Sequence, residues 1–124
     1  MARFWRAVVI AVAWSFAPVS WAQTDAQLVA EGEALVRAGR YAEAYKLLEP
    51  HEDKLAGDMK FDYLLARAAL ESGQPSKASF IYERILAVEP NFVGVRLEMG
   101  RAYLALGDFA RAKLEFETVL RFDN

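Results

Sequence analysis

Apolar side chains recur at intervals of three and four residues along most of the chain, which is the spacing of one helix face. The pattern begins at Asp25 and is clearest in residues 75–87 and 109–122. No segment alternates between apolar and polar residues in the manner of a half-buried strand. The pattern therefore predicts an all-α protein whose helices cover residues 25–37, 41–56, 59–71, 75–87, 93–105 and 109–122.

Three glycines punctuate this pattern at a constant spacing, since Gly39, Gly73 and Gly107 lie 34 residues apart. Each follows a predicted helix, where the chain favours a residue that tolerates a positive φ. A constant period of this length indicates a repeated pair of helices. Small residues follow the same period and predict close approach of the two helices in each pair; they are Gly32, Ala66 and Gly100 on the first helices and Ala44, Ala78 and Ala112 on the second.

One predicted helix, over residues 41–56, contains Pro50. Proline has no backbone N–H and its ring clashes with the preceding turn, so a helix rarely continues through it undisturbed. We expect a kink near residues 46–50, or a break after which Pro50 begins a short helix through Leu55. The other helix starts are marked by N-cap residues and a first-turn proline, namely Asp58, Asn91, Asp108 and Pro75.

The aromatic side chains fall mostly on the apolar faces of these helices. Tyr and Phe bury large areas and are usually part of a core when they lie on such a face. Phe80 and Phe122 lie off the main stripe, and we expect them between units or exposed. The aromatic residues predicted for the core are Tyr41, Tyr82, Tyr103, Phe109 and Phe116.

The repeat resembles the tetratricopeptide repeat (TPR) family over about residues 25–124. The family has a 34-residue helix–turn–helix unit with small residues at these registers. Other matching positions are Tyr41 and Phe109 after the turn glycine, Leu48, Tyr82 and Phe116 after the small residue, and Pro90 at the end of a unit; the family's early Trp is replaced by Leu28, Asp62 and Arg96. The resemblance and the period predict an α-solenoid of three units, about 25–58, 59–92 and 93–124.

The first 22 residues have a different character. Two arginines precede an apolar run over residues 7–17, and a small-x-Ala pattern follows at residues 20–22. This order is typical of a secretory signal peptide, so we expect cleavage after Ala22 and one repeat domain over residues 23–124. A retained membrane anchor is the alternative, but eleven helical residues rise only about 16 Å against a hydrocarbon core of about 30 Å.

The composition excludes several classes of function. The formal net charge of −2 argues against a nucleic-acid-binding surface, which needs a clustered basic face. The chain has no cysteine, so it has neither a disulfide framework nor a thiol nucleophile. Its single histidine, His51, lies in a charged stretch with no positioned partner. We therefore predict no catalytic, cofactor or metal site.

A helical solenoid binds its partners differently, because the first helices of successive units line a concave surface. Residues of these helices that lie away from the small-residue seam should face the groove: Val29, Glu33, Val36, Lys60, Tyr63, Arg67, Leu70, Leu97, Arg101 and Leu104. The predicted protein-binding site is the part from Lys60 to Leu104. Its apolar contacts would give affinity, and Arg67 and Arg101 would bind a carboxylate or carbonyl. The alternative is that these arginines are ordinary solvated charges.

Units two and three also resemble, more narrowly, the periplasmic TPR segment that precedes an outer-membrane barrel in the surface lipoprotein assembly modifier family. That resemblance implies a periplasmic module with a protein or peptide partner in outer-membrane or surface-protein assembly. A structural spacer for an attached outer-membrane part is the alternative function. On the last predicted helix, the apolar residues Val119, Leu120 and Phe122 have no following helix to cover those that face outward. We expect a C-terminal extension, self-association or docking onto a partner to cover them.

Overall fold

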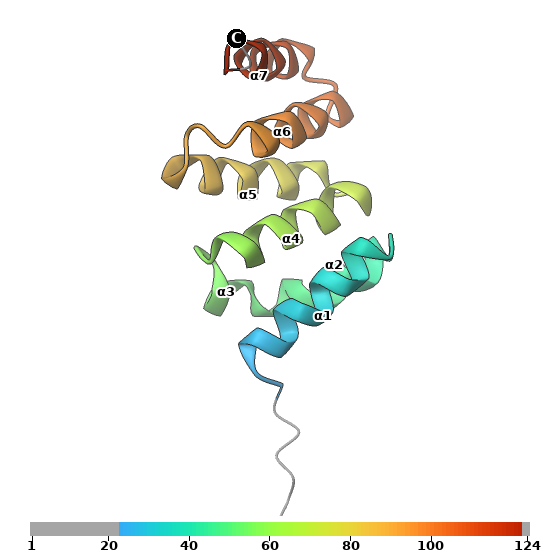
Figure 1. Ribbon diagram of the computed structural model, residues 1–124. Helices are drawn as coiled ribbons and strands as arrows, with labels where there is room; N and C mark the ends of the chain where they lie inside the picture. Colours follow the sequence, from blue (N-terminus) through green and yellow to red (C-terminus); the bar gives the residue numbers. More distant parts are fainter. Residues whose placement is uncertain (1–22, 123–124) are drawn as a thin grey trace, which may run out of the picture.

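The computed structural model describes residues 23–122 as a stack of helices, with no strand in that part of the chain. α1, α2 and α3 lie together at the lower end of the stack, and α4, α5, α6 and α7 follow above them in order (Figure 1). The all-α, repeat-like arrangement predicted from the spacing is confirmed. The predicted signal peptide, residues 1–22, lies outside the described residues. The elements are α1 (Asp25–Arg37), α2 (Tyr41–Leu48), the 3₁₀ turn η1 (Glu49–His51), α3 (Glu52–Leu55), α4 (Met59–Glu71), α5 (Pro75–Val88), α6 (Val93–Ala105) and α7 (Phe109–Phe122).

The helix boundaries follow local chemistry. Gly39, Gly73 and Gly107 have φ values of 73°, 85° and 75°, so each supplies the left-handed conformation that ends the preceding helix. The Asp58 carboxylate accepts from the Phe61 N–H at 2.8 Å and caps α4. Two further N-caps are Thr24, which forms a capping box with Gln27, and Asp108, which accepts from the Arg111 N–H.

The expected cap at Asn91 is wrong. The N-cap of α6 is Phe92, and no side chain caps this helix. The loop before α6 is held instead by Arg96, whose Nε and Nη2 donate to the Pro90 carbonyl oxygen at 3.0 and 2.8 Å. A side chain from within the helix therefore reaches back to the loop, which a search for N-cap residues cannot detect.

Pro50 breaks the second helix of the first unit, as predicted. The α-helix ends at Leu48, the chain makes the 3₁₀ turn η1, and α3 continues only from Glu52 to Leu55. The break follows from the missing N–H at Pro50, which leaves the carbonyl four residues earlier without its helical donor. The short α3 extends this unit toward α4 and α5.

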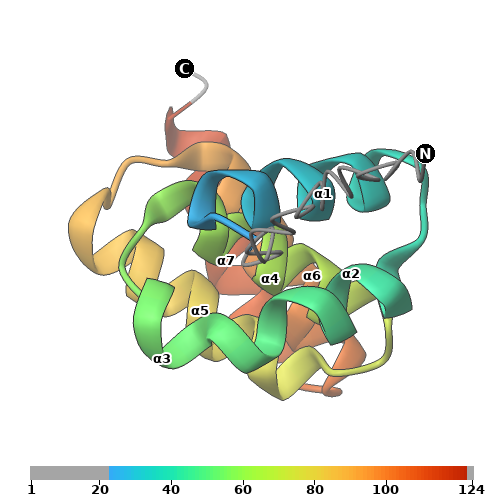
Figure 2. The same ribbon diagram turned by 90° about the horizontal axis from the view of Figure 1, so that it is seen from below.

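The helices pack as successive pairs around a shared core. α4 contacts α1, α2, α5 and α6, and α5 contacts α6. Seen along the stack, α1 and the α2–α3 segment lie across the near end, with the later helices behind them (Figure 2). The core runs through all three units, and its large members include Leu28, Leu48, Phe61, Leu65, Ile81, Tyr82, Val95 and Met99.

The small residues at the repeated registers lie where the paired helices approach. A Cβ at Gly100 would lie 2.5 Å from the Phe116 ring, and one at Gly32 would lie 2.8 Å from the Leu48 side chain. Ala44, Ala78 and Ala112 are all buried. The seam predicted from the 34-residue period is therefore real, and its glycines make room for the large residue of the partner helix.

Burial decreases along the last unit. On α7 only Ala112 is buried among the described side chains, and Phe116 and Val119 are partly exposed. Phe109 is 69% exposed, so its predicted place in the core is wrong. The reason is that α7 packs mainly against α6. Tyr82 and Tyr103 are buried as predicted, Tyr41 is partly exposed, and Phe80 and Phe122 are exposed.

Candidate protein-binding face

The predicted site residues lie on the three first helices, α1, α4 and α6, in rows set by the 34-residue period. One row is apolar or aromatic, the middle row is charged, and the third row is apolar. We call this surface the groove face. Its rows are Val29, Tyr63 and Leu97; Glu33, Arg67 and Arg101; and Val36, Leu70 and Leu104.

The apolar rows are accessible to a ligand. Leu97 and Leu104 on α6 are each 45% exposed, and Tyr63 and Leu70 on α4 are partly exposed. An open hollow of about 410 Å³ lies beside the start of α1 and α4, lined in part by Val29 and Lys60. Exposed apolar side chains offer contact area that a partner could remove from water.

Among the predicted site residues, Lys60 and Arg101 already have acidic neighbours. Lys60 Nζ lies 2.7 Å from Glu33 Oε2, and this contact lowers the pKa of Glu33. Arg101 bridges two helices, with Nη2 2.7 Å from Glu71 of α4 and Nη1 2.8 Å from Glu98. Hydrogen bonding to Glu71 is the main cause that raises the pKa of Arg101. The charge of Arg101 is therefore largely balanced within the chain.

Arg67 has a different environment, although it occupies the same repeat position as Arg101. No carboxylate forms an ion pair with it among residues 23–122. Side-chain hydrogen bonding with Tyr63 is the first cause that raises the pKa of Arg67, and Tyr41 contributes to it. Its Nε–H is buried and has no hydrogen-bond partner in the described chain.

Tyr82 lies behind this face and was predicted only as a core residue. Its side chain is fully buried, but its hydroxyl also has no hydrogen-bond partner in the described part of the chain. Burial is the main cause that raises the pKa of this hydroxyl, and the charges of Glu98, Arg67 and Arg101 also act on it. The hydroxyl is therefore buried within the electrostatic reach of Arg67 and Arg101, the two arginines of the charged row.

The sequence interpretation missed the acidic partners of the face. Glu98 stands three residues before Arg101, which is a spacing that pairs side chains on a helix, so a local signal for it existed. Glu71 lies 30 residues away on another helix, and only the packing of α4 against α6 brings it to Arg101. The unpaired Tyr82 hydroxyl has no sequence signal.

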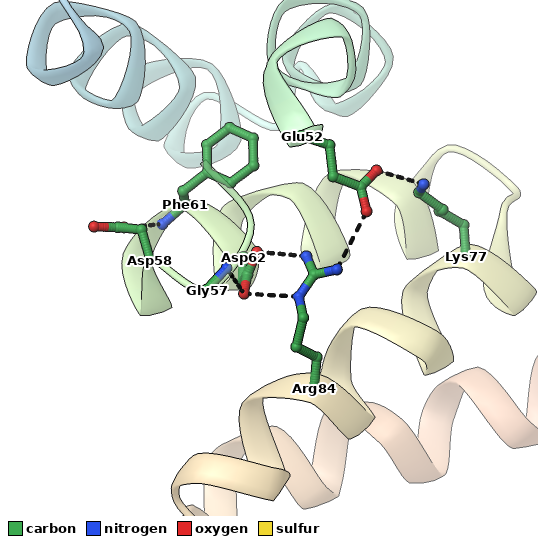
Figure 3. Close-up of polar contacts among 7 residues, drawn as sticks. All are labelled: Glu52, Gly57, Asp58, Phe61, Asp62, Lys77 and Arg84. Carbon is green, nitrogen blue, oxygen red and sulfur yellow. Dashed lines mark hydrogen bonds and ion pairs between the residues drawn. The ribbon is translucent and has the colours of Figure 1, made fainter. Parts of the chain in front are cut away.

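A buried ionic network anchors α4, the central helix of the face (Figure 3). Asp62 is 1% exposed. Its two carboxylate oxygens accept from Arg84 Nη2 at 2.5 Å and Nε at 3.0 Å. The Gly57 N–H also donates to it at 3.0 Å. Glu52 of α3 lies 3.4 Å from Arg84 Nη1 and pairs with Lys77. The network joins α3, α4 and α5, so it sets the position of the helix that carries Tyr63 and Arg67.

Among the described residues, no group of His, Cys, Asp and Glu could hold a metal ion, and no helix there is long and apolar enough to cross a membrane. His51 is exposed and lies in η1, away from the groove face. Partly exposed aromatic and aliphatic rows around a charged row suit contact with another polypeptide.

The fold and this face define a helical repeat protein. Comparison with known families agrees, because a model described as tetratricopeptide repeat matches residues 35–91 and 69–124. The chain belongs to the tetratricopeptide repeat family. It is also similar to sperm-associated antigen 1 from Homo sapiens, with 30% identity over 110 residues. That alignment covers 82% of this chain and 12% of the relative, so the chain spans a small part of that protein.

Proposed function

We propose that this chain is a protein-interaction module without catalytic activity, and that its groove face binds a peptide or protein segment. The observation that carries the proposal is the row pattern, in which exposed Leu97 and Leu104 flank the charged row at Arg101. The membership in a family of helical repeats supports it. In a solenoid the first helices of successive units line one continuous surface.

The apolar and charged rows would contribute to binding in different ways. The apolar rows supply contact area, which gives most of the affinity, and the charged row fixes the direction and register of the bound segment. Helices pack about 8–10 Å apart and an extended chain advances about 3.3 Å per residue. Two such spacings amount to about 16–20 Å. A segment of about eight extended residues, which covers about 26 Å, would therefore cross all three first helices and extend slightly beyond them.

We also propose that the module is exported and acts in the periplasm, in outer-membrane or surface-protein assembly. The support for export is the sequence of residues 1–22, with its arginines, apolar run and small-x-Ala pattern. The support for the assembly role is the resemblance of units two and three to the surface lipoprotein assembly modifier family. Coverage of α7 by a further segment, a second copy or a partner belongs to the same proposal.

A second function, that of a spacer without its own ligand, is favoured by one observation. Two members of the charged row, Glu33 and Arg101, are already paired with Lys60 and Glu71 of the same chain, so part of the row is satisfied without any partner. Exposed ion pairs of this kind contribute little to binding. The two functions differ in whether the groove face touches another protein.

Site-specific crosslinking in cells separates them. A photo-crosslinking residue placed at position 97 or 104 should capture a defined partner, whereas one at position 80, on α5, should not. Changing Arg67 and Arg101 together to Ala should abolish the capture at position 97, while circular dichroism shows the helices retained. Arg40→Ala, an exposed arginine paired with Glu43, is the matched control. No capture at either position would favour the spacer, and capture that is unchanged by the double substitution would show that the arginines take no part in binding.

A further inference from the structure

Two polar atoms near the charged row are buried without a hydrogen-bond partner in the described chain. They are Nε of Arg67 and the hydroxyl oxygen of Tyr82. A buried donor left unpaired loses its hydration and gains nothing in exchange. Folded proteins leave few such groups, and each one calls for an explanation. Each atom therefore needs an acceptor from outside the chain, which a water molecule or a ligand can supply.

Both atoms belong to the same small region. Arg67 lies on α4 and Tyr82 on α5, and these helices form one packed pair. The side chains of Tyr63 and Glu98 are near both groups, since each contributes to the pKa shift of Arg67 and to that of Tyr82. An acceptor that enters between α4 and α6 would reach this region.

The charge at Arg67 favours an anion over a neutral acceptor. Arg101, at the equivalent repeat position, has carboxylates on both terminal nitrogens. Arg67 is held mainly by tyrosine hydroxyls, and the charge of Glu98 also acts on it, but no ion pair joins it to a carboxylate among residues 23–122, so its charge is less balanced than that of Arg101. Hydrogen bonds between arginine and a carboxylate are about twice as strong as neutral ones.

We propose that Arg67 and the Tyr82 hydroxyl bind the carboxylate of an Asp or Glu side chain in the bound segment. A carboxylate accepts up to about four hydrogen bonds, so one group can serve both donors. Arg67 is partly exposed and provides the entry; its side chain shifts on binding to admit an oxygen to the covered hydroxyl. Because Leu70 and Leu97 lie in the flanking rows, the acidic residue is flanked by apolar ones. This inference rests on the proposed function.

The test uses the purified chain and synthetic peptides of about eight residues, the length that spans three first helices. Each peptide carries apolar residues around one central Glu, and its matched partner carries Gln. Binding is measured by fluorescence anisotropy, and ¹⁵N-detected NMR shifts at Tyr63 and Leu97 report whether the groove face is the place of contact. The variants are Arg67→Gln, Tyr82→Phe and Arg101→Gln, with Arg40→Gln as the matched control.

The expected result is tighter binding of the Glu peptide than of the Gln peptide. Arg67→Gln should remove this preference, weakening the Glu peptide about tenfold or more. Tyr82→Phe should weaken it roughly three- to tenfold, and Arg40→Gln should change nothing. Arg101→Gln should have a smaller effect than Arg67→Gln, because Arg101 must first leave its own acidic partners.

Several results would overturn the assignment. They are equal binding of the Glu and Gln peptides, no loss in Tyr82→Phe, or a larger loss in Arg101→Gln than in Arg67→Gln. If both peptides shift the Tyr63 and Leu97 signals equally, the carboxylate site is wrong and the groove function stands. If no peptide shifts them, the proposed function itself fails.

Discussion

The middle and last units share nearly the same local signals and differ sharply in burial. Both have a turn glycine, an alanine five residues later and a large aromatic residue four further on. Leu86 of α5 is 8% exposed, whereas Leu120, at the same repeat position on α7, is 63% exposed. Local sequence therefore decides where the helices form and pair, and the neighbouring helices decide which side chains become core.

The same two units also differ at the position where the family has its Trp. Unit two has Asp62, which is buried and accepts three hydrogen bonds. Unit three has Arg96, whose Nη1 lies 3.0 Å from Glu115 of α7. Each charge is paired with the second helix of its own unit, but with opposite polarity. The position thus joins the two helices of a unit in both cases, by ionic contacts instead of a large ring.

The largest effect should come from breaking the buried pair of the middle unit. Asp62→Ala leaves Arg84 and the Gly57 N–H without their acceptor, and should cost about 3 kcal/mol in the free energy of unfolding. Arg96→Ala removes the ion pair with Glu115 and the hydrogen bonds to the Pro90 carbonyl. It should cost less, about 1–2 kcal/mol, because Glu115 lies on α7, which packs mainly against α6 and leaves this carboxylate room to turn toward water. Urea denaturation of both variants measures the difference. Equal losses of unfolding free energy would mean that the stability cost of breaking such a pair does not depend on its position in the stack.

A second comparison concerns the small-residue seam. Ala78→Leu inserts a large side chain between helices that are covered on both sides, and should cost about 2 kcal/mol. Ala112→Leu should cost about 1 kcal/mol, because α7 packs mainly against α6 and can move outward. Thermal melts followed by circular dichroism compare the two. A neutral result for both substitutions would remove the packing argument for the seam.

The two smallest predicted changes in the free energy of unfolding should have opposite signs. Tyr103→Phe removes a hydroxyl that donates to Glu83 at 2.8 Å, and should cost about 1 kcal/mol. Tyr82→Phe removes a buried hydroxyl without a partner in the described chain, and should stabilise the free protein by up to about 1 kcal/mol. Denaturant titration checks both variants. A loss in Tyr82→Phe would show that this hydroxyl is already satisfied, for instance by water.

Tyr103 adds a pH signature to the same comparison. Burial and the hydrogen bond to Glu83 raise the pKa of Tyr103 to about 12, from a reference value of 10.0. A pKa raised by folding stabilises the protein below pH 10, and this contribution is lost as the pH rises toward 12. The wild-type chain should therefore lose more stability over this interval than Tyr103→Phe does.

Most of the fold could be predicted from the sequence because similar local signals for helix ends and helix pairing recur in the three units. The turn glycines, the Asp58 and Asp108 caps and the Pro50 break all depend on residues within one turn of the feature they control. The failures were of another kind. Phe109 was assigned to the core from its place on an apolar stripe, but a stripe does not reveal whether a neighbouring helix covers it.

The groove face could be predicted only in outline. The period brought Arg67 and Arg101 to equivalent places, and their different environments then came from residues far apart in the sequence. Glu71 pairs with Arg101 across two helices, and Tyr41 contributes to the environment of Arg67 from the preceding unit. Such contacts depend on how α4 sits between its neighbours. Whether these residues bind a partner stays a prediction.

The break at Pro50 has a consequence for how the molecule folds and opens. It deprives the first unit of a continuous second helix, which weakens that unit by itself, yet it places Glu52 against Arg84 and Lys77 of the next unit. In a linear array, a repeat that is unstable by itself but contacts its neighbour strongly folds and unfolds together with that neighbour. The first unit should then form after the second, with the second as its template, and the two should exchange their amide protons together.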